Sequence, residues 1–122
     1  MNSLSSHKST EPQSGVLYIV GTPIGNLEDL SLRALNTLKN VSLIACEDTR
    51  QTKKLLSRYQ FSNNLISFNK VNSFEKIPKL ISYLKSGKSI ALVSDAGMPS
   101  ICDPGEDLVK RTKSKGFNII CI

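Results

Sequence analysis

The chain has 122 residues, of which 39% are apolar and 6% aromatic, and 16 Lys and Arg against 10 Asp and Glu give it a net charge of +6. This length suits one domain with a single core. No apolar run approaches the ~18 residues of a membrane-spanning helix. Residues 1–14 are polar and Ser-rich and lack the apolar centre of a secretory signal, so we expect a disordered tail there.

The three cysteines, Cys46, Cys102 and Cys121, are widely spaced, and the single histidine, His7, lies in the tail. This pattern lacks the ligand spacing of a zinc site, so we expect no metal and reduced thiols in a cytoplasmic protein. The positive charge favours polyanions such as RNA, but only weakly, because the chain is rich in Lys throughout.

From residue 16 onward, short apolar runs alternate with amphipathic segments. Residues 16–20 (VLYIV) predict a buried strand, and residues 31–40 predict a helix. The apolar face of this helix is expected to carry three leucines at a spacing of three residues, Leu32, Leu35 and Leu38. A strand at residues 42–46, a helix at 49–59 and a strand at 65–68 follow.

The next helix has clear signals at both ends. We expect Asn72 to be its N-cap, with Glu75 completing a capping box, and Gly87 is typical of a helix C-cap. Pro78 lies inside the segment and should kink the helix or make its first turns irregular. Residues 89–93 (SIALV) then predict a fourth strand.

The last two elements are a helix at residues 104–115, with Gly116 as its stop, and a fifth strand at residues 118–122. Five strands that alternate with helices predict an α/β fold, a parallel five-stranded sheet with flanking helices. The continuous apolar runs suit strands that are buried on both faces. Because the chain stops within the fifth strand, we expect further chain to be missing there.

The chemically distinctive residues lie in the loops that follow the strands. In a parallel sheet these loops meet at the carboxyl edge, where α/β proteins bind ligands. In chain order the loops are residues 21–29 (GTPIGNLED), 47–52 (EDTRQT), 69–72 (NKVN) and 94–105 (SDAGMPSICDPG). The loops at the opposite edge are plain connectors, so the sequence predicts a site at the carboxyl edge.

The first and fourth of these loops are rich in Gly and Pro. The G-x-x-x-G spacing and the missing amide of Pro23 argue against a pyrophosphate cradle, so the first loop is either a rigid wall beside a small ligand or an ordinary turn. In the fourth loop, Asp95 follows the strand closely enough to bind a hydroxyl pair or an amino group. The alternative is a loop that only leads into the next helix.

The loop after the second strand concentrates charge. Asp48 or Thr49 could cap the helix that begins there, but a cap does not explain Glu47 and Arg50 as well. A basic stripe with a spacing of four residues also starts here and consists of Arg50, Lys54 and Arg58. The stripe is either a solvated helix face or a track for RNA phosphates.

Three motifs occur together, namely residues 20–29 (VGTPIGNLED), 45–52 (ACEDTRQT) and 91–105 (ALVSDAGMPSICDPG). With them the chain resembles, over residues 16–122, the bacterial 16S rRNA ribose 2′-O-methyltransferases of the tetrapyrrole methylase superfamily. The EDTR and SDAGxP forms point to the rRNA branch. After the third strand the chain departs from that family, because only Asn72 matches a stretch that is usually His-rich and ends in Asn-Glu.

The resemblance implies a two-domain enzyme that holds S-adenosyl-L-methionine between its domains. Residues 15–122 would be the N-terminal, cofactor-binding domain, with the second domain missing. The positions that the resemblance assigns to the cofactor are Pro23, Ile24, Ser94, Asp95, Gly97, Met98, Ser100 and Ile101. The positions that it places on the substrate side, as catalytic residues, are Glu47, Asp48 and Arg50.

The implied reaction transfers the sulfonium methyl group to the ribose 2′-hydroxyl of a cytidine in 16S rRNA. Glu47 or Asp48 would assist as the base, and Arg50 would pair with a phosphate or a carboxylate. The reaction needs no metal. The implied partner is 16S rRNA or the small ribosomal subunit, and the superfamily often forms homodimers.

Two other functions fit parts of the sequence. The first is a methylase of the same superfamily that acts on a small tetrapyrrole, although the EDTR loop and the basic stripe argue against it. The second is a truncated, catalytically inactive half-domain that binds RNA or a partner chain, or simply a truncated product. The ending inside a strand and the missing His-rich stretch after the third strand favour it.

Overall fold

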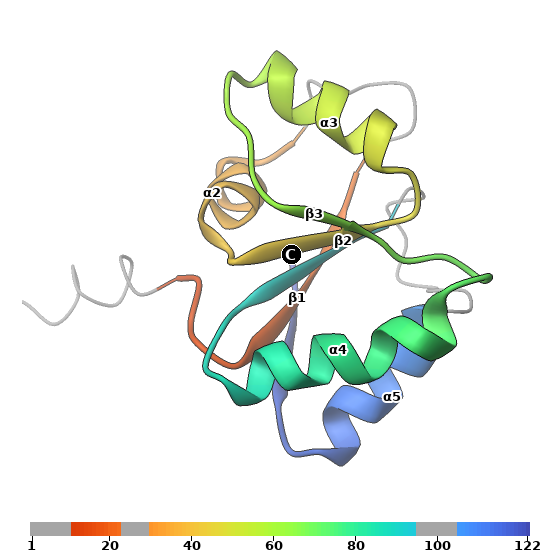
Figure 1. Ribbon diagram of the computed structural model, residues 1–122. Coiled ribbons are helices and arrows are strands. Elements are labelled where there is room, and N and C mark those ends of the chain that lie inside the picture. Colours follow the sequence, from red (N-terminus) through yellow and green to blue (C-terminus); the bar gives the residue numbers. More distant parts are fainter. Residues whose placement is uncertain (1–10, 23–29, 95–104) are drawn as a thin grey trace, which may run out of the picture.

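A computed structural model of the protein describes residues 11–22, 30–94 and 105–122, which form a parallel sheet with helices on both faces (Figure 1). The strands are β1 (Val16–Gly21), β2 (Leu43–Cys46), β3 (Leu65–Ser67), β4 (Ile90–Ser94) and β5 (Asn118–Cys121). The helices are α2 (Leu32–Asn40), α3 (Thr49–Arg58), α4 (Ser73–Lys85) and α5 (Gly105–Ser114). The predicted α/β fold is therefore confirmed, with element ends that differ by one or two residues.

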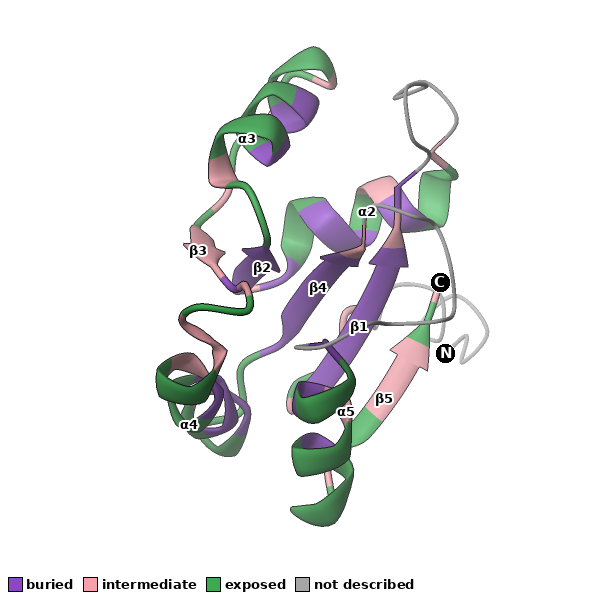
Figure 2. Cartoon of the chain, turned by 90° about the vertical axis from the view of Figure 1, so that its right-hand side faces the viewer, coloured by how far each residue is buried: buried purple, intermediate pink, exposed green. Residues whose placement is uncertain are grey.

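The strand order is β3-β2-β4-β1-β5, and every neighbouring pair is parallel. The fourth strand in the chain therefore lies between the first and the second. The three central strands, β1, β2 and β4, are almost entirely buried, whereas β3 and β5 form half-buried edges (Figure 2). Burial on both faces explains why the central strands are continuous apolar runs.

Each face of the sheet carries its own core because side chains alternate along a strand. On one face Leu17 and Ile19 pack in a cluster with Leu80 of α4 and Leu108 of α5. On the other face Tyr18 packs in a cluster to which α2 and α3 contribute Ala34, Leu38 and Leu56. Helices α2 and α3 thus cover one face and α4 and α5 the other (Figure 1). Among the described helices, none has the length and apolar character needed to cross a membrane.

Helix α2 differs from the sequence prediction in the face that it buries. Its buried residues are Ala34, Thr37 and Leu38, whereas Leu32 is 85% exposed. A spacing of three residues falls about 60° short of a full turn at 3.6 residues per turn, so Leu32 and Leu38 point about 120° apart. Leu38 faces the sheet, and Leu32 consequently cannot.

The start of α4 also differs from the prediction. Asn72 is the N-cap residue, but its side chain makes no capping hydrogen bond, and its φ of −109° and ψ of 1° lie outside the extended region that a capping box uses. The helix continues past Pro78 to Lys85. Its end agrees with the prediction, because Gly87 adopts a φ of +87° directly after the helix, a conformation that glycine favours.

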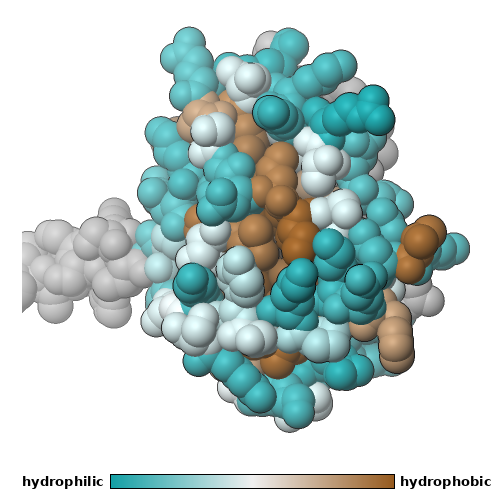
Figure 3. Space-filling view, viewed as in Figure 1, coloured by the Kyte–Doolittle hydropathy of each residue, from teal (hydrophilic) through white to brown (hydrophobic). Residues whose placement is uncertain are grey.

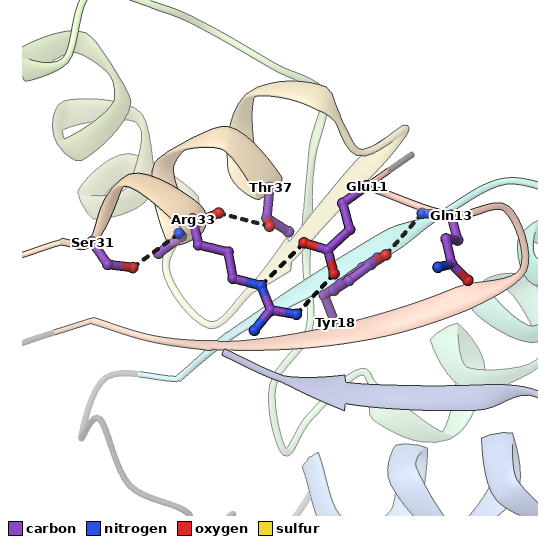
Figure 4. Close-up of polar contacts among 7 residues, drawn as sticks. Glu11, Gln13, Tyr18, Ser31, Arg33 and Thr37 are labelled. Carbon is purple, nitrogen blue, oxygen red and sulfur yellow. Dashed lines mark hydrogen bonds and ion pairs between the residues drawn. The ribbon is translucent and has the colours of Figure 1, made fainter. Parts of the chain in front are cut away.

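Residues 11–14, which we expected to be part of a disordered tail, contact the folded domain. The carboxylate of Glu11 accepts two hydrogen bonds from the Arg33 guanidinium of α2, at 3.0 and 2.8 Å (Figure 4). The amide of Gln13 donates to the hydroxyl of the fully buried Tyr18 at 2.8 Å. These contacts hold the segment before β1 against α2 and the sheet.

Candidate functional site

The connections that leave the carboxyl edge of the sheet run alternately to its two faces. The chain passes from β1 to α2 and from β2 to α3 on one face, and from β3 to α4 and from β4 to α5 on the other. In the order β3-β2-β4-β1, each strand therefore sends its chain to the opposite face from its neighbour. Such topological switch points open the crevices in which α/β proteins bind ligands.

One switch point lies between β1 and β4, whose last residues, Gly21 and Ser94, are paired across the sheet. The next residue, Thr22, donates from its amide to the Ser94 carbonyl at 2.9 Å and from its hydroxyl at 3.2 Å. Thr22 is only 6% exposed. The two segments that carry the predicted cofactor positions therefore start next to each other, where Thr22 is buried and hydrogen-bonded to Ser94.

Another of these switch points, between β2 and β3, holds a groove of about 650 Å³. It is lined by Glu47, Asp48, Thr49, Arg50, Gln51, Thr52, Ser67 and Asn69. Neighbouring strands lie ~4.8 Å apart, so the β2/β3 switch point is about 10 Å along the sheet from the β1/β4 switch point.

Asp48 is the N-cap of α3. One of its carboxylate oxygens, Oδ1, accepts hydrogen bonds from the amides of Arg50 at 2.9 Å and Gln51 at 3.4 Å. This is the capping role that the sequence left open for Asp48 or Thr49, and the structure assigns it to Asp48. Its carboxylate is therefore already engaged with the backbone.

The side chains of Glu47 and Arg50 do not cap α3 and are available to a ligand in the groove. Both side chains are exposed and line the groove. Within the described ranges neither Glu47 nor Arg50 takes part in a salt bridge, unlike Arg33, which pairs with Glu11. An unpaired carboxylate next to an unpaired guanidinium can accept a proton and contact a phosphate within one groove.

The far wall of the groove is held by asparagine side chains. Asn72 donates from Nδ2 to the Ser67 carbonyl at 3.2 Å and to the Ser67 hydroxyl at 2.9 Å, and its Oδ1 accepts from the Asn69 amide at 2.9 Å. The Asn69 Oδ1 accepts in turn from the amides of Val71 and Asn72. The side chain of Asn72, which was predicted to cap α4, therefore holds Ser67 and Asn69 in place on one side of the groove.

All three predicted catalytic residues, Glu47, Asp48 and Arg50, thus line one groove. Of the predicted cofactor positions, Ser94 ends β4, where it is half-buried. The other cofactor positions lie outside the described residues, namely Pro23, Ile24, Asp95, Gly97, Met98, Ser100 and Ile101. In the parts that the structure describes, no group of three or more His, Cys, Asp or Glu side chains could hold a metal ion.

Ser67, Asn69 and Thr22 are residues for which the sequence suggested no role. The segment 69–72 was expected at the carboxyl edge, but nothing in its composition indicated which side chain lines a groove. Thr22 carried no signal beyond its place after a buried strand. Their roles depend on which strands lie next to each other in the sheet, and a local sequence pattern does not predict this.

Comparison with known proteins agrees with this geometry. The family model of the Tetrapyrrole (Corrin/Porphyrin) Methylases matches residues 16–121. The protein named Ribosomal RNA small subunit methyltransferase I of Streptococcus pyogenes serotype M6 is 53% identical over 109 residues, which cover 89% of this chain and 38% of that protein. Its namesake in Bacillus subtilis is 57% identical over 96 residues, covering 79% and 33%. The one in Thermotoga maritima is 52% identical over 105 residues, covering 86% and 47%.

Solved structures with the same fold include two methyltransferases. A cobalamin biosynthetic enzyme, cobalt precorrin-4 methyltransferase, superposes with a TM-score of 0.72 at 17% identity over 88% of this chain and 45% of its own. The uroporphyrin-III-C-methyltransferase of Thermus thermophilus has a TM-score of 0.67 at 21% identity over 88% and 46%. The present chain spans less than half the length of all these relatives. The family match over nearly the whole described sheet, together with these relatives, shows that the chain belongs to the tetrapyrrole (corrin/porphyrin) methylase family.

Proposed function

We propose that this chain forms the cofactor-binding part of an S-adenosyl-L-methionine-dependent rRNA methyltransferase. The observation that carries the proposal is the presence of two switch points on the same carboxyl edge, separated by the boundary between β2 and β4. One lies where β1 and β4 end and the predicted cofactor positions begin, and the other holds the groove with Glu47 and Arg50. Relatives at 52–57% identity that are named rRNA small subunit methyltransferases support RNA as the substrate.

The β1/β4 crevice suits the cofactor better than the groove does. Ser94 and Thr22 fix the ends of both strands, so segments that follow them start from defined positions. The sequence of those segments, rich in Gly and Pro, permits close approach of the backbone to a ligand. In this proposal Pro23, Ile24 and Ser94 line the cofactor, together with Asp95, Gly97, Met98, Ser100 and Ile101.

The proposed acceptor is the ribose 2′-hydroxyl of a cytidine in 16S rRNA, bound in the β2/β3 groove. The bound cofactor would supply an electrophilic methyl group on its sulfonium sulfur. Glu47 would accept the proton of the ribose hydroxyl that receives this methyl group. Arg50 binds the adjacent phosphate and so orients the ribose. Asp48 is the weaker candidate for the base, because it already caps α3.

Cofactor binding is tested by isothermal titration calorimetry of the 122-residue chain with S-adenosylmethionine and S-adenosylhomocysteine. We expect saturable binding of both, with the matched control being adenosine alone. A chain that is folded by circular dichroism and binds neither ligand would contradict the proposal and favour a half-domain that binds RNA or a partner without catalysis.

The acceptor is tested in a chimera in which residues 16–121 replace the matching segment of the Bacillus subtilis relative. The chimera is incubated with radiolabelled cofactor and small ribosomal subunits from a strain that lacks the relative. We expect label in 16S rRNA that mass spectrometry maps to a cytidine ribose. Label transferred instead to an added porphyrinoid would support the small-molecule alternative. Sedimentation of the chimera would test the predicted homodimer.

A further inference from the structure

Helix α3 has an unusual balance of charge. Its ten residues (TRQTKKLLSR) include four cations and no acidic residue. Thr52, Leu55 and Leu56 are buried against the domain. The helical period therefore turns the polar residues outward, and the exposed set is Arg50, Gln51, Lys53, Lys54, Ser57 and Arg58. We call this set the α3 basic face. It contains one more cation, Lys53, than the stripe predicted from the sequence.

The α3 basic face is continuous with the groove at the carboxyl edge. Arg50 lines the groove and also two shallow hollows beside the helix. One hollow, of about 480 Å³, lies between Lys53 and the segment 62–65, and the other, of about 460 Å³, runs over the outer surface as far as Arg58. A polymer that enters the groove past Arg50 can therefore continue along the whole helix, about 15 Å at 1.5 Å per residue.

Three of the four cations on α3, Arg50, Lys53 and Lys54, take part in no salt bridge in the described part of the chain. Helix α5 is also basic toward its end, but it begins with Glu106 and Asp107. Hydrophilic side chains predominate on the outside of α3, and apolar surface lies beside and below it, toward the edge strand β3 (Figure 3). Beyond Glu47 and Asp48 at its start, α3 thus presents only cations among its charged side chains, which favours a positive local field along the helix.

We propose that the α3 basic face binds the phosphate backbone of the RNA that flanks the nucleotide in the groove. This rests on the proposed function, since it assumes that the groove receives the target ribose. The charge and the lack of exposed aromatic side chains on α3 suit phosphate contacts that position a strand without reading its bases. A membrane surface is a poorer partner, because the apolar side of α3 is already buried in the domain.

The test compares two double variants of the 122-residue chain that remove the same charge. Lys53→Gln with Lys54→Gln neutralises the α3 basic face and leaves Arg50 intact, and Lys110→Gln with Lys113→Gln neutralises exposed cations of α5 on the opposite layer. Fluorescence anisotropy measures the Kd for a labelled single-stranded RNA over a series of salt concentrations. We expect the α3 variant to bind on the order of tenfold more weakly, with a salt slope smaller by about 1.4 for two lost contacts. The α5 variant should match the parent.

Three results would overturn the proposal: equal weakening in both variants, an unchanged Kd in the α3 variant, or a parent chain that does not bind RNA. Circular dichroism and urea unfolding check that both variants are folded. Calorimetry with S-adenosylmethionine separates this proposal from the proposed function. If the parent binds S-adenosylmethionine but its affinity for RNA does not depend on Lys53 and Lys54, only the proposal for the α3 basic face is refuted. Loss of cofactor binding in the parent refutes the cofactor assignment and leaves the RNA result to stand by itself.

Discussion

The main-chain carbonyl of Ser94 accepts two hydrogen bonds from Thr22, one from the amide and one from the hydroxyl. The bonds join the ends of β1 and β4, which are distant in the sequence but adjacent in the sheet. Thr22 is buried, so the bonds form where water does not compete with them. The two hydrogen bonds consequently fix the distance between the two strand ends at which the proposed cofactor site begins.

We expect Thr22→Val to lower the free energy of unfolding by about 0.5–1.5 kcal/mol, because it removes the hydroxyl donor while keeping the size and branching of the side chain. The amide bond to Ser94 survives, which keeps the loss small. Urea unfolding followed by circular dichroism measures the change, and calorimetry should show weaker S-adenosylmethionine binding. Thr22→Ser, which keeps the hydroxyl, is the control; if both variants behave alike, the hydroxyl bond contributes nothing.

Glu47→Gln should abolish most of the methyl transfer in the chimera with the Bacillus subtilis relative. The substitution keeps the shape of the side chain and removes its basicity, and general base catalysis typically contributes about 10²–10⁴-fold in rate. The unfolding free energy should be unchanged, since Glu47 is exposed and forms no ion pair within the described ranges. An initial-rate assay with radiolabelled cofactor checks this, and unchanged turnover would remove Glu47 as the base.

Asp48 should show the opposite behaviour. Asp48→Ala should destabilise the domain by about 1 kcal/mol, because the amides of Arg50 and Gln51 lose their acceptor, whereas Asn is nearly as good an N-cap as Asp. Urea unfolding of the two variants measures the difference. Asp48→Asn should also keep most of the turnover of the chimera. A rate loss for Asp48→Asn as large as that for Glu47→Gln would mean that Asp48 takes part in the chemistry.

The pair of Glu11 and Arg33 should make stability depend on pH. The hydrogen bonds from Arg33 lower the pKa of Glu11 below its usual value, so this contribution is complete above the unfolded pKa of about 4.5 and is lost as the pH falls through the lower, folded pKa. Glu11→Gln should therefore be slightly less stable than the parent at neutral pH and equal to it near pH 2. Urea midpoints over this range measure the difference.

Arg33→Gln provides the matched control for the same pair. It removes the cation and leaves the carboxylate, so it should lower stability at neutral pH by a similar amount, and the double variant should lose little more. A difference between Glu11→Gln and the parent that stays constant with pH would show that the ion pair is not the cause.

Local sequence patterns determined the elements of this fold. Strands that are buried on both faces must be continuously apolar, so runs such as VLYIV predict β1 and its neighbours. Gly87 and Gly116 end their helices because both adopt a positive φ, which glycine adopts without strain. Because these constraints act within a few residues, the sequence also indicated that the Gly-, Pro- and Asp-rich loops follow the strands.

The tertiary structure alone decided which of those loops meet. The apolar runs do not show that β4 pairs between β1 and β2. This pairing brings Thr22 to Ser94 and creates switch points at the carboxyl edge. It also decided side-chain partners. Leu32 is exposed because Leu38 occupies the sheet-facing side of α2, and Asn72 bonds Ser67 instead of capping α4. Such contacts join residues that only the folded sheet makes neighbours, so a periodic pattern along the chain cannot contain them.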